Sequence, residues 1–314
     1  MAALTRIDVH HHFVPPAYRD EMNKKRPMQP CMQSWTIQNS IDDMDKAGTQ
    51  IALVSITTPG LYFGHVEEAR KLSRLCNDYA MEMIRNHPGR FGLFAAIPWP
   101  DVEGSLKEVE YALDTLKADG ICMFTSYGDR WLGHNDFNPL FEELNRRKAI
   151  VYVHPHAAAC CIDLIAEVNE SIIEYGTDTT RTINSLIFTG SSTRYPNIQW
   201  IFSHAGGTMP FLIERMVNLA KLPHVAAKLP NGLMHELKRF YYDTAQASNG
   251  VALGALKAVA GAGQIVFGTD YPYRLSIEHV DGVAGAGLTK DEMIGIDHRN
   301  ALRLLPNLAK LIKA

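Results

Sequence analysis

Cysteine is scarce and unpatterned in this chain of 314 residues. The five cysteines are an odd number, the only close pair (Cys160 and Cys161) is adjacent, and no Cys-X-X-Cys motif occurs. This usage argues against a disulfide framework and indicates a reducing compartment. No run is apolar for long enough to span a bilayer, and the N-terminal segment has no apolar signal core. We therefore expect a cytoplasmic protein with no membrane partner.

An excess of charge of one sign is also lacking, because 31 basic residues face 34 acidic ones and the formal net charge is −3. No basic face is implied, so nucleic acid is not an expected partner. Apolar residues make up 46% of the chain, which is enough for a large core in one barrel or in two ordinary domains. The sequence also lacks internal repeats and low-complexity tracts.

What the chain does have is a set of metal-competent side chains, each directly after a short apolar run. His10 and His12 lie in Ile-Asp-Val-His-His-His, His154 follows Val-Tyr-Val, His204 follows Ile-Phe-Ser, and Asp270 follows Val-Phe-Gly-Thr. Side chains alternate along an extended segment, so His10 and His12 should point to the same side. Neutral imidazoles with one carboxylate are ligands that a borderline divalent cation such as zinc prefers. The pattern predicts a metalloenzyme.

Eight short runs rich in β-branched and aromatic residues are predicted to be strands. They cover approximately residues 6–9, 50–56, 91–97, 120–124, 150–153, 198–203, 240–243 and 264–268. Helical periodicity lies between most of them, over residues 66–86, 105–117, 138–147, 208–219 and 251–260. This alternation predicts an α/β protein, either a single TIM-like (β/α)8 barrel over residues 1–314 or an open doubly wound sheet. We favour the barrel, because only closure brings the ends of the first and last strands together and faces both toward strands five and six.

One long stretch, residues 13–39, interrupts the alternation after the first strand. An insertion beside a barrel mouth predicts a lid or a pocket wall. Apolar side chains here and in the loop after the second strand are candidates to line a substrate pocket, although core packing explains them equally well. These candidates are Phe13, Trp35, Leu61, Tyr62 and Phe63.

Seven motifs, in order along the chain, resemble the amidohydrolase superfamily, within it the nonoxidative decarboxylases related to aminocarboxymuconate semialdehyde decarboxylase. They cover residues 7–12, 134–141, 153–155, 178–181, 203–207, 242–245 and 268–272. The resemblance implies that His10, His12, His154 and Asp270 bind one metal ion per chain. It also implies that Asp270 and His204 are catalytic. Zinc is the expected ion, and manganese is the alternative.

Two absences refine the resemblance. Binuclear hydrolases of the superfamily often bridge two metals with a modified lysine after strand four, but residues 122–128 contain no lysine. The muconate semialdehyde enzymes carry a carboxylate-binding arginine before the second strand, but residues 39–45 contain none. The missing arginine disfavours a dicarboxylate substrate and favours an aromatic monocarboxylate with an ortho hydroxyl. Within the family, the chain most resembles the fungal 6-methylsalicylate decarboxylases. The reaction this implies belongs to secondary metabolism and converts 6-methylsalicylate, a small aromatic carboxylic acid, to m-cresol and carbon dioxide.

In that reaction a protonated Asp270 is expected to deliver a proton to the ring carbon that bears the carboxylate, with His204 orienting it. The alternative is metal-dependent hydrolysis of a lactone, ester or amide, which would use the same ligands. Relatives suggest a homo-oligomer, a dimer or higher.

Some polar residues have two interpretations. Arg181 and Arg274 are candidates to bind a substrate carboxylate, or they form structural ion pairs. Asp243 follows a predicted strand and could be no more than a helix cap. The sequence leaves open whether His11 and His156 take part in the site.

Overall fold

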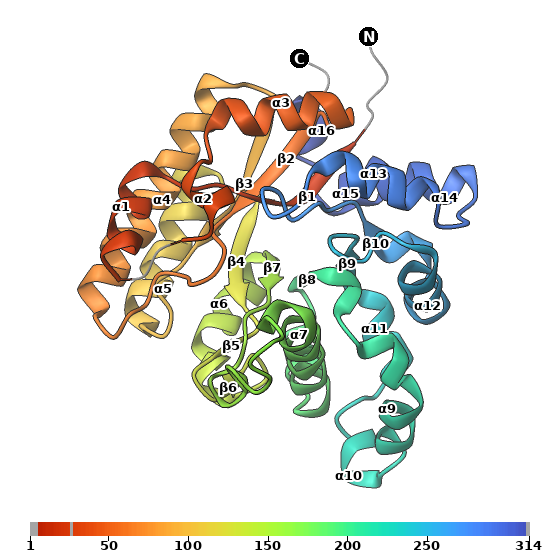
Figure 1. The fold of residues 1–314 in the computed structure, drawn as a ribbon. Coiled ribbons are helices and arrows are strands. Elements are labelled where there is room, and N and C mark those ends of the chain that lie inside the picture. Colours follow the sequence, from red (N-terminus) through yellow and green to blue (C-terminus); the bar gives the residue numbers. More distant parts are fainter. Residues whose placement is uncertain (1–5, 26–27, 312–314) are drawn as a thin grey trace.

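A ring of parallel strands lies at the centre of the computed structural model, which describes residues 6–25 and 28–311 (Figure 1). The sheet order is β1-β2-β3-β4-β7-β8-β9-β10, and each neighbouring pair is parallel. The strands are β1 (Ile7–His12), β2 (Ile51–Ser55), β3 (Phe91–Ala96), β4 (Gly120–Phe124), β7 (Ile150–His154), β8 (Gln199–Phe202), β9 (Tyr241–Asp243) and β10 (Ile265–Val266).

Backbone hydrogen bonds close the ring between β1 and the segment that follows β10. The N–H of Val9 donates to the oxygen of Phe267 at 2.9 Å, and the N–H of His12 donates to the oxygen of Tyr271 at 2.7 Å. β1 continues through its histidines, beyond the predicted end at residue 9, and His11 and His12 also pair with β2. The first and last strands lie side by side, so the predicted TIM-like barrel is confirmed and the open sheet is excluded.

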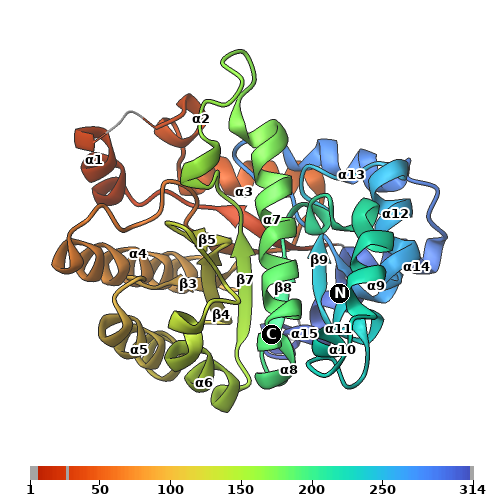
Figure 2. The ribbon, with the colours of Figure 1, turned by 90° about the horizontal axis from the view of Figure 1, so that it is seen from below.

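Helices cover the outside of the barrel (Figure 1, Figure 2). Helix α4 (Val66–Asn86) shows why, because its buried Ala69, Leu72, Cys76 and Ala80 recur every three or four residues and form one apolar face. Its bounds are as predicted, and so are those of α6 (Asn138–Arg147). The other long helices are α3 (Ile37–Ala47), α5 (Val102–Glu110), α6 (Asn138–Arg147), α7 (Glu170–Phe188), α9 (Ile213–Ala220), α11 (Leu233–Arg239), α12 (Gly250–Ala260) and α13 (Ser276–Ala284).

Inward-facing side chains fill the barrel and leave its carboxyl end for the site. Ile7, Leu53, Phe94 and Tyr152 belong to one buried cluster, and α15 (Asn300–Leu304) packs against it. A filled interior means that chemistry is possible only above it, where the strands end. Within the described ranges, no helix combines the length and the apolar character needed to cross a membrane.

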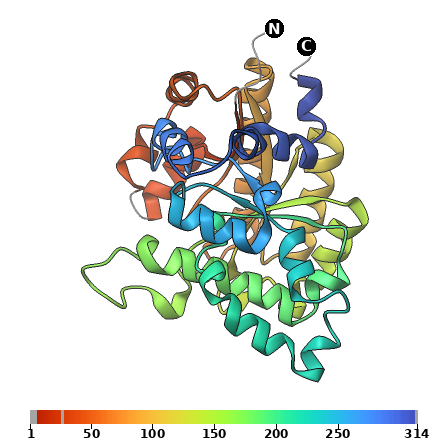
Figure 3. The ribbon, with the colours of Figure 1, turned by 90° about the vertical axis from the view of Figure 1, so that its right-hand side faces the viewer.

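The predicted insertion forms α1 (Pro16–Lys25), α2 (Pro30–Gln33) and the start of α3. Residues 26–27 of this insertion lie outside the described ranges. A second excursion precedes α7 and projects from the body of the molecule in two perpendicular views (Figure 2, Figure 3). A two-stranded hairpin, β5 (Ser126–Tyr127) with β6 (Arg130–Trp131), follows β4.

Candidate metal centre

Four side chains from three parts of the chain meet at the carboxyl end of the barrel. His10 and His12 lie on β1, His154 is the last residue of β7, and Asp270 follows β10. All four are buried, and one ligand atom from each lies within 4.8 Å of the others. The Nε2 atoms of His10 and His12 are 3.1 Å apart because residues two positions apart on a strand share a face.

His154 gives the clearest sign that this cluster fits a metal ion. Its side chain is buried, and neither Nδ1 nor Nε2 has a hydrogen-bond partner within the described part of the chain. Burial, together with the neighbouring His12 and His10, lowers the pKa of His154 well below its usual value, so the ring stays neutral. A neutral imidazole with a lone pair directed at other ligands is what a divalent cation binds. The donor set therefore supports a divalent metal cofactor.

The shifted pKa values of His10 and Asp270 also support a metal ion at this cluster. Burial lowers the pKa of His10, but the carboxylates of Asp243 and Asp270 outweigh burial and raise it to about 10. Burial raises the pKa of Asp270, but His10 and hydrogen bonds from His10, His12 and His204 hold it well below its usual value. The site thus favours positive charge between its imidazoles and carboxylates. The lowered pKa favours the carboxylate form of Asp270, so Asp270 must gain a proton before it can act as the proton donor expected from the sequence.

Asp243, at the end of β9, contacts the ring nitrogen of His10 that faces away from the metal ligand cluster. Its Oδ2 lies 2.8 Å from Nδ1 of His10, and its Oδ1 accepts from the backbone N–H groups of His204 and Ala245 at 2.8 and 3.0 Å. A hydrogen on Nδ1 leaves Nε2 of His10 available as a ligand. Gly268 permits this approach, because a Cβ there would lie 2.9 Å from the Cβ atoms of both residues. Asp243 is thus more than a helix cap.

Two polar side chains contact Asp270 from the open side. Nε2 of Gln246 donates to Oδ2 of Asp270 at 2.9 Å, and Nε2 of His204 lies 3.4 Å from the same oxygen. His204, Gln246 and Asp270 adopt φ angles of 53°, 55° and 63°, which residues other than glycine rarely do. Strain concentrated in one place is typical of functional sites. Sequence reasoning missed Gln246, because a lone glutamine in a loop gives no signal.

The side chains of His154, His204, Gln246 and Asp270 border a cavity of about 560 Å³, which we call the metal cavity. Further walls include Gln29 of the 13–39 insertion, Ile172, Tyr175, Thr208, Tyr273 and Arg274. Arg274 brings a cationic group that is ion-paired with Glu278. The volume is sufficient for a substituted benzoic acid.

The aromatic side chains predicted to bind a substrate do not gather around this cavity. Phe13 stacks on Tyr79 in the buried core, with ring centroids 6.5 Å apart. Trp35 is buried, and its Nε1 donates to Oγ of Ser40 at 2.9 Å. Phe63 packs against the core with Lys25 4.8 Å above its ring.

Three other candidates also lie outside the metal cavity. Leu61 and Tyr62 line a different cavity. Arg181 lies 3.5 Å from carboxylate oxygens of both Asp178 and Glu174. Of the two arginines considered, Arg274 is the one that borders the metal cavity.

The two histidines left open by the sequence also lie outside the metal ligand set. His11 faces away from it, with Nδ1 3.1 Å from Oδ2 of Asp8 and Nε2 3.0 Å from Oγ of Ser40. His156 contacts Ser126 and borders two neighbouring cavities. Residues 122–128, which begin within β4, contain no lysine.

The barrel and this centre together define a metal-dependent enzyme. Residues 7–306 match the amidohydrolase family. A decarboxylase of Aspergillus niger is 38% identical over 286 residues, covering 86% of this chain and 78% of that protein. The 6-methylsalicylic acid decarboxylase of Penicillium expansum is 33% identical over 319 residues, covering 98% of each chain. The chain belongs to the amidohydrolase family, and it is an enzyme of the decarboxylase branch, as the sequence motifs predicted.

A solved structure shares the fold. The dihydroxybenzoic acid decarboxylase of Polaromonas, with bound manganese and the inhibitor 2-nitroresorcinol, superposes with a TM-score of 0.85 at 20% identity. The match covers 96% of this chain and 97% of that one. At 20% identity, this comparison supports the barrel fold alone.

Proposed function

We propose that this enzyme is a metal-dependent, nonoxidative decarboxylase that converts 6-methylsalicylate to m-cresol and carbon dioxide. The observation that carries the proposal is the buried cluster of three imidazoles and Asp270 opening on a cavity of about 560 Å³. A relative at 33% identity, covering 98% of each chain, is a 6-methylsalicylic acid decarboxylase, which supports this choice of substrate.

The residues around Asp270 have to move one proton. When bound, a divalent ion supplies positive charge that holds the substrate and stabilises its anionic oxygen. Asp270 starts as a carboxylate, so it can accept the proton of the ortho hydroxyl as the substrate binds. It then delivers this proton to the ring carbon that bears the carboxylate. His204 and Gln246 both contact Oδ2 of Asp270 and orient it for both transfers.

The remaining steps balance the reaction. The bond between the ring and the carboxylate breaks, carbon dioxide leaves, and the electron pair of that bond restores the aromatic ring. The ring oxygen takes a proton from solvent as the phenol is released. The sum is one carboxylate and one proton giving one phenol and one carbon dioxide.

Zinc is the ion we propose, because a set of three imidazoles and one carboxylate suits it, and manganese is the alternative. The described cysteines are all free, which supports our proposal of a cytoplasmic location. Gln29 borders the metal cavity, so we propose that residues 13–39 form one of its walls.

We also propose that the protein acts as a homo-oligomer, a dimer or higher. The excursion before α7 exposes Ile162, Leu164 and Ile165, whose accessible fractions are 51%, 65% and 49%. A group of exposed apolar side chains is typical of a subunit contact. Sedimentation analysis tests this, and a monomer at all concentrations would contradict it.

The test of the function pairs elemental analysis with a product assay. The purified enzyme should contain one divalent metal ion per chain and release m-cresol and carbon dioxide from 6-methylsalicylate in equal amounts. The matched control substrate is 2-methylbenzoate, which keeps the methyl and carboxylate groups but lacks the ortho hydroxyl, and it should not react. Hydrolysis of a lactone, ester or amide without carbon dioxide release from any hydroxybenzoate would overturn the proposal.

A further inference from the structure

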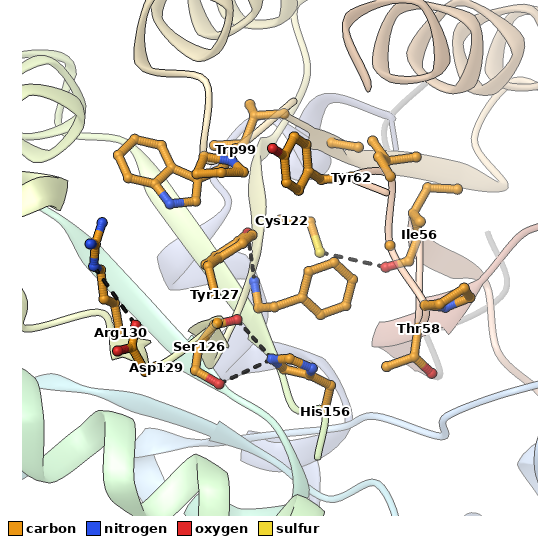
Figure 4. A pocket seen from close by; sticks show the side chains of 18 residues that line it. Ile56, Thr58, Tyr62, Trp99, Cys122, Ser126, Tyr127, Asp129, Arg130 and His156 are labelled. Atoms are coloured by element: carbon orange, nitrogen blue, oxygen red, sulfur yellow. Dashed lines mark hydrogen bonds and ion pairs between the residues drawn. The ribbon is translucent and has the colours of Figure 1, made fainter. Parts of the chain in front are cut away.

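A second cavity lies at the carboxyl ends of β2, β3 and β4 (Figure 4). Its volume is about 320 Å³, and we call it the aromatic cavity. It has no lining residue in common with the metal cavity. Phe124 stands between the two, since its ring borders the aromatic cavity and lies 6.1 Å from the ring of His154. The aromatic cavity is therefore a neighbour of the metal centre but separate from it.

Four aromatic side chains form part of the walls of the aromatic cavity. Tyr62, Trp99 and Tyr127 surround the space in Figure 4, with Cys122 between them, and Phe124 is a further lining residue. The ring of Tyr127 lies 6.3 Å from that of Trp99 and 6.1 Å from that of Phe124. Flat apolar walls around a volume of this size suit one substituted benzene ring.

His156, which lines the aromatic cavity, has one ring nitrogen that is able to accept a hydrogen bond. Nε2 of His156 lies 2.7 Å from the backbone oxygen of Ser126, which can only accept, so Nε2 carries the hydrogen. In the neutral ring Nδ1 is then an acceptor. A hydroxyl group on a bound ring could donate to it.

The charged groups at the rim disfavour a carboxylate. Arg130 brings a guanidinium group to this cavity, but it is already ion-paired with Asp136 and lies 3.9 Å from Oδ1 of Asp129. Asp129, on the same rim, is 96% exposed and adds negative charge. A carboxylate would meet a neutralised cation and an anion, whereas an uncharged phenol needs no counter-charge. These charges favour an uncharged phenol over an aromatic acid.

A third cavity, of about 230 Å³, lies between the other two. It shares Thr58, Pro59 and His156 with the aromatic cavity. It shares Gln29, Tyr175 and Tyr273 with the metal cavity. A small ring leaving the metal centre thus has neighbouring space that leads to the aromatic cavity.

We propose that the aromatic cavity is a second binding site, specific for an uncharged phenol, which holds the released product while a new acid enters the metal cavity. The choice of m-cresol as this phenol rests on the proposed function. The site itself rests on the ring-sized volume, the aromatic walls, the acceptor edge and the lack of an unpaired cation among the described lining residues.

The direct test is a crystal of the metal-loaded enzyme soaked with 3-bromophenol, in which bromine replaces the methyl group of m-cresol. Anomalous scattering should place bromine among Trp99, Phe124 and Tyr127. Bromine in the metal cavity alone, or no bound bromine, would overturn the proposal. This test does not depend on turnover, so a bound phenol without decarboxylation of 6-methylsalicylate would count against the proposed function only.

A kinetic test uses inhibition of the enzyme by m-cresol. A phenol that binds together with the substrate gives mixed inhibition. Ala96 lines the aromatic cavity, so the larger side chain of Ala96→Leu should fill part of the space. Inhibition by m-cresol should then become competitive. Binding of m-cresol to the substrate-loaded enzyme should weaken about tenfold, which corresponds to a loss of about 1.4 kcal/mol of binding free energy. Ala96→Ser nearly preserves the volume and should keep mixed inhibition.

A second filling variant keeps the kinetic test decisive if Ala96→Leu does not fold. Leu61→Trp fills the same cavity from a loop, where a larger side chain is easier to accommodate. It should also make inhibition competitive. Unchanged mixed inhibition in a folded filling variant would place the second phenol elsewhere and overturn the assignment.

Discussion

Nδ1 of His10 and Oδ2 of Asp243 lie 2.8 Å apart, although 233 positions separate the two residues in the chain. Both side chains are fully buried. A carboxylate behind a metal-binding imidazole fixes the orientation of the ring, selects its tautomer and increases its basicity. The same carboxylate also accepts from the backbone N–H of His204, so one side chain positions two parts of the site.

Asp243→Asn should therefore weaken metal binding without unfolding the protein. The variant keeps the shape of the side chain and an oxygen acceptor but loses the negative charge behind His10. We expect a loss of about 10- to 100-fold in metal affinity, measured by titration against a competing chelator. Asp291→Asn, which removes the charge of an exposed ion pair with Arg299, is the matched control. Equal affinities in the two variants would show that Asp243 does not tune the metal.

The barrel and the four-residue metal cluster could be predicted because both depend on patterns within short stretches of the sequence. Strands and helices alternate with clear periods, and each member of the cluster follows an apolar run. The end of β1 was harder to place, because His11 and His12 become strand through pairing with Val54 and Ser55 of β2 and through contacts with Tyr271, all of them distant in the sequence.

The roles of Gln246 and Trp35 could not be predicted for a different reason. Gln246 reaches Asp270 only because its backbone adopts a positive φ, which nothing in the local sequence requires. A tryptophan in the core and a tryptophan in a ligand site have the same side chain, so the sequence alone does not distinguish the two roles for Trp35. The residues packed around it decide whether it faces a cavity or the core. The sequence suggests that Tyr62 lines a pocket, but it does not show whether this pocket is the metal cavity or the aromatic cavity.

His154→Ala should remove the metal and abolish decarboxylation. In the metal-free protein the same change breaks no hydrogen bond of the imidazole, because neither ring nitrogen has a partner among the described residues. The free energy of unfolding should therefore not fall by the amount that a lost hydrogen bond usually costs. Elemental analysis and thermal unfolding with and without metal measure both effects. His235→Ala, on the exposed face of α11, is the control. Full metal content in His154→Ala would overturn the ligand assignment.

Trp35→Phe should lower stability and leave substrate affinity unchanged. The indole N–H donates to Oγ of Ser40, which also contacts Nε2 of His11, so its loss should cost about 1 kcal/mol of unfolding free energy. Chemical denaturation and the KM for 6-methylsalicylate measure the two quantities. A large rise in KM without a change in stability would instead support Trp35 as a substrate-binding residue, as the sequence suggested.

Asp119 should make the protein less stable as the pH rises through the acidic range. Burial raises the pKa of this side chain to about 6, while Oδ2 accepts from the N–H of Leu93 at 2.9 Å. Between pH 4 and pH 6 the folded protein binds more protons at Asp119 than the unfolded chain, so stability is lost as this proton leaves. Asp119→Asn should remove that loss. The stability advantage of the variant should grow from pH 4 to pH 6 in chemical denaturation; a pH-independent difference would contradict the shift.

Gln246 allows the proton-transfer role of Asp270 to be tested without disturbing the metal ligand itself. Gln246→Ala and Gln246→Gly both remove the N–H that donates to Oδ2 of Asp270, so both should lower kcat about tenfold with the metal retained. The two variants differ in the backbone, because glycine adopts a φ of 55° without strain and alanine does not. Gln246→Gly should therefore be more stable than Gln246→Ala by about 1 kcal/mol. If kcat instead followed stability, Gln246 would act through the loop, and orientation of the carboxylate by its amide would be wrong.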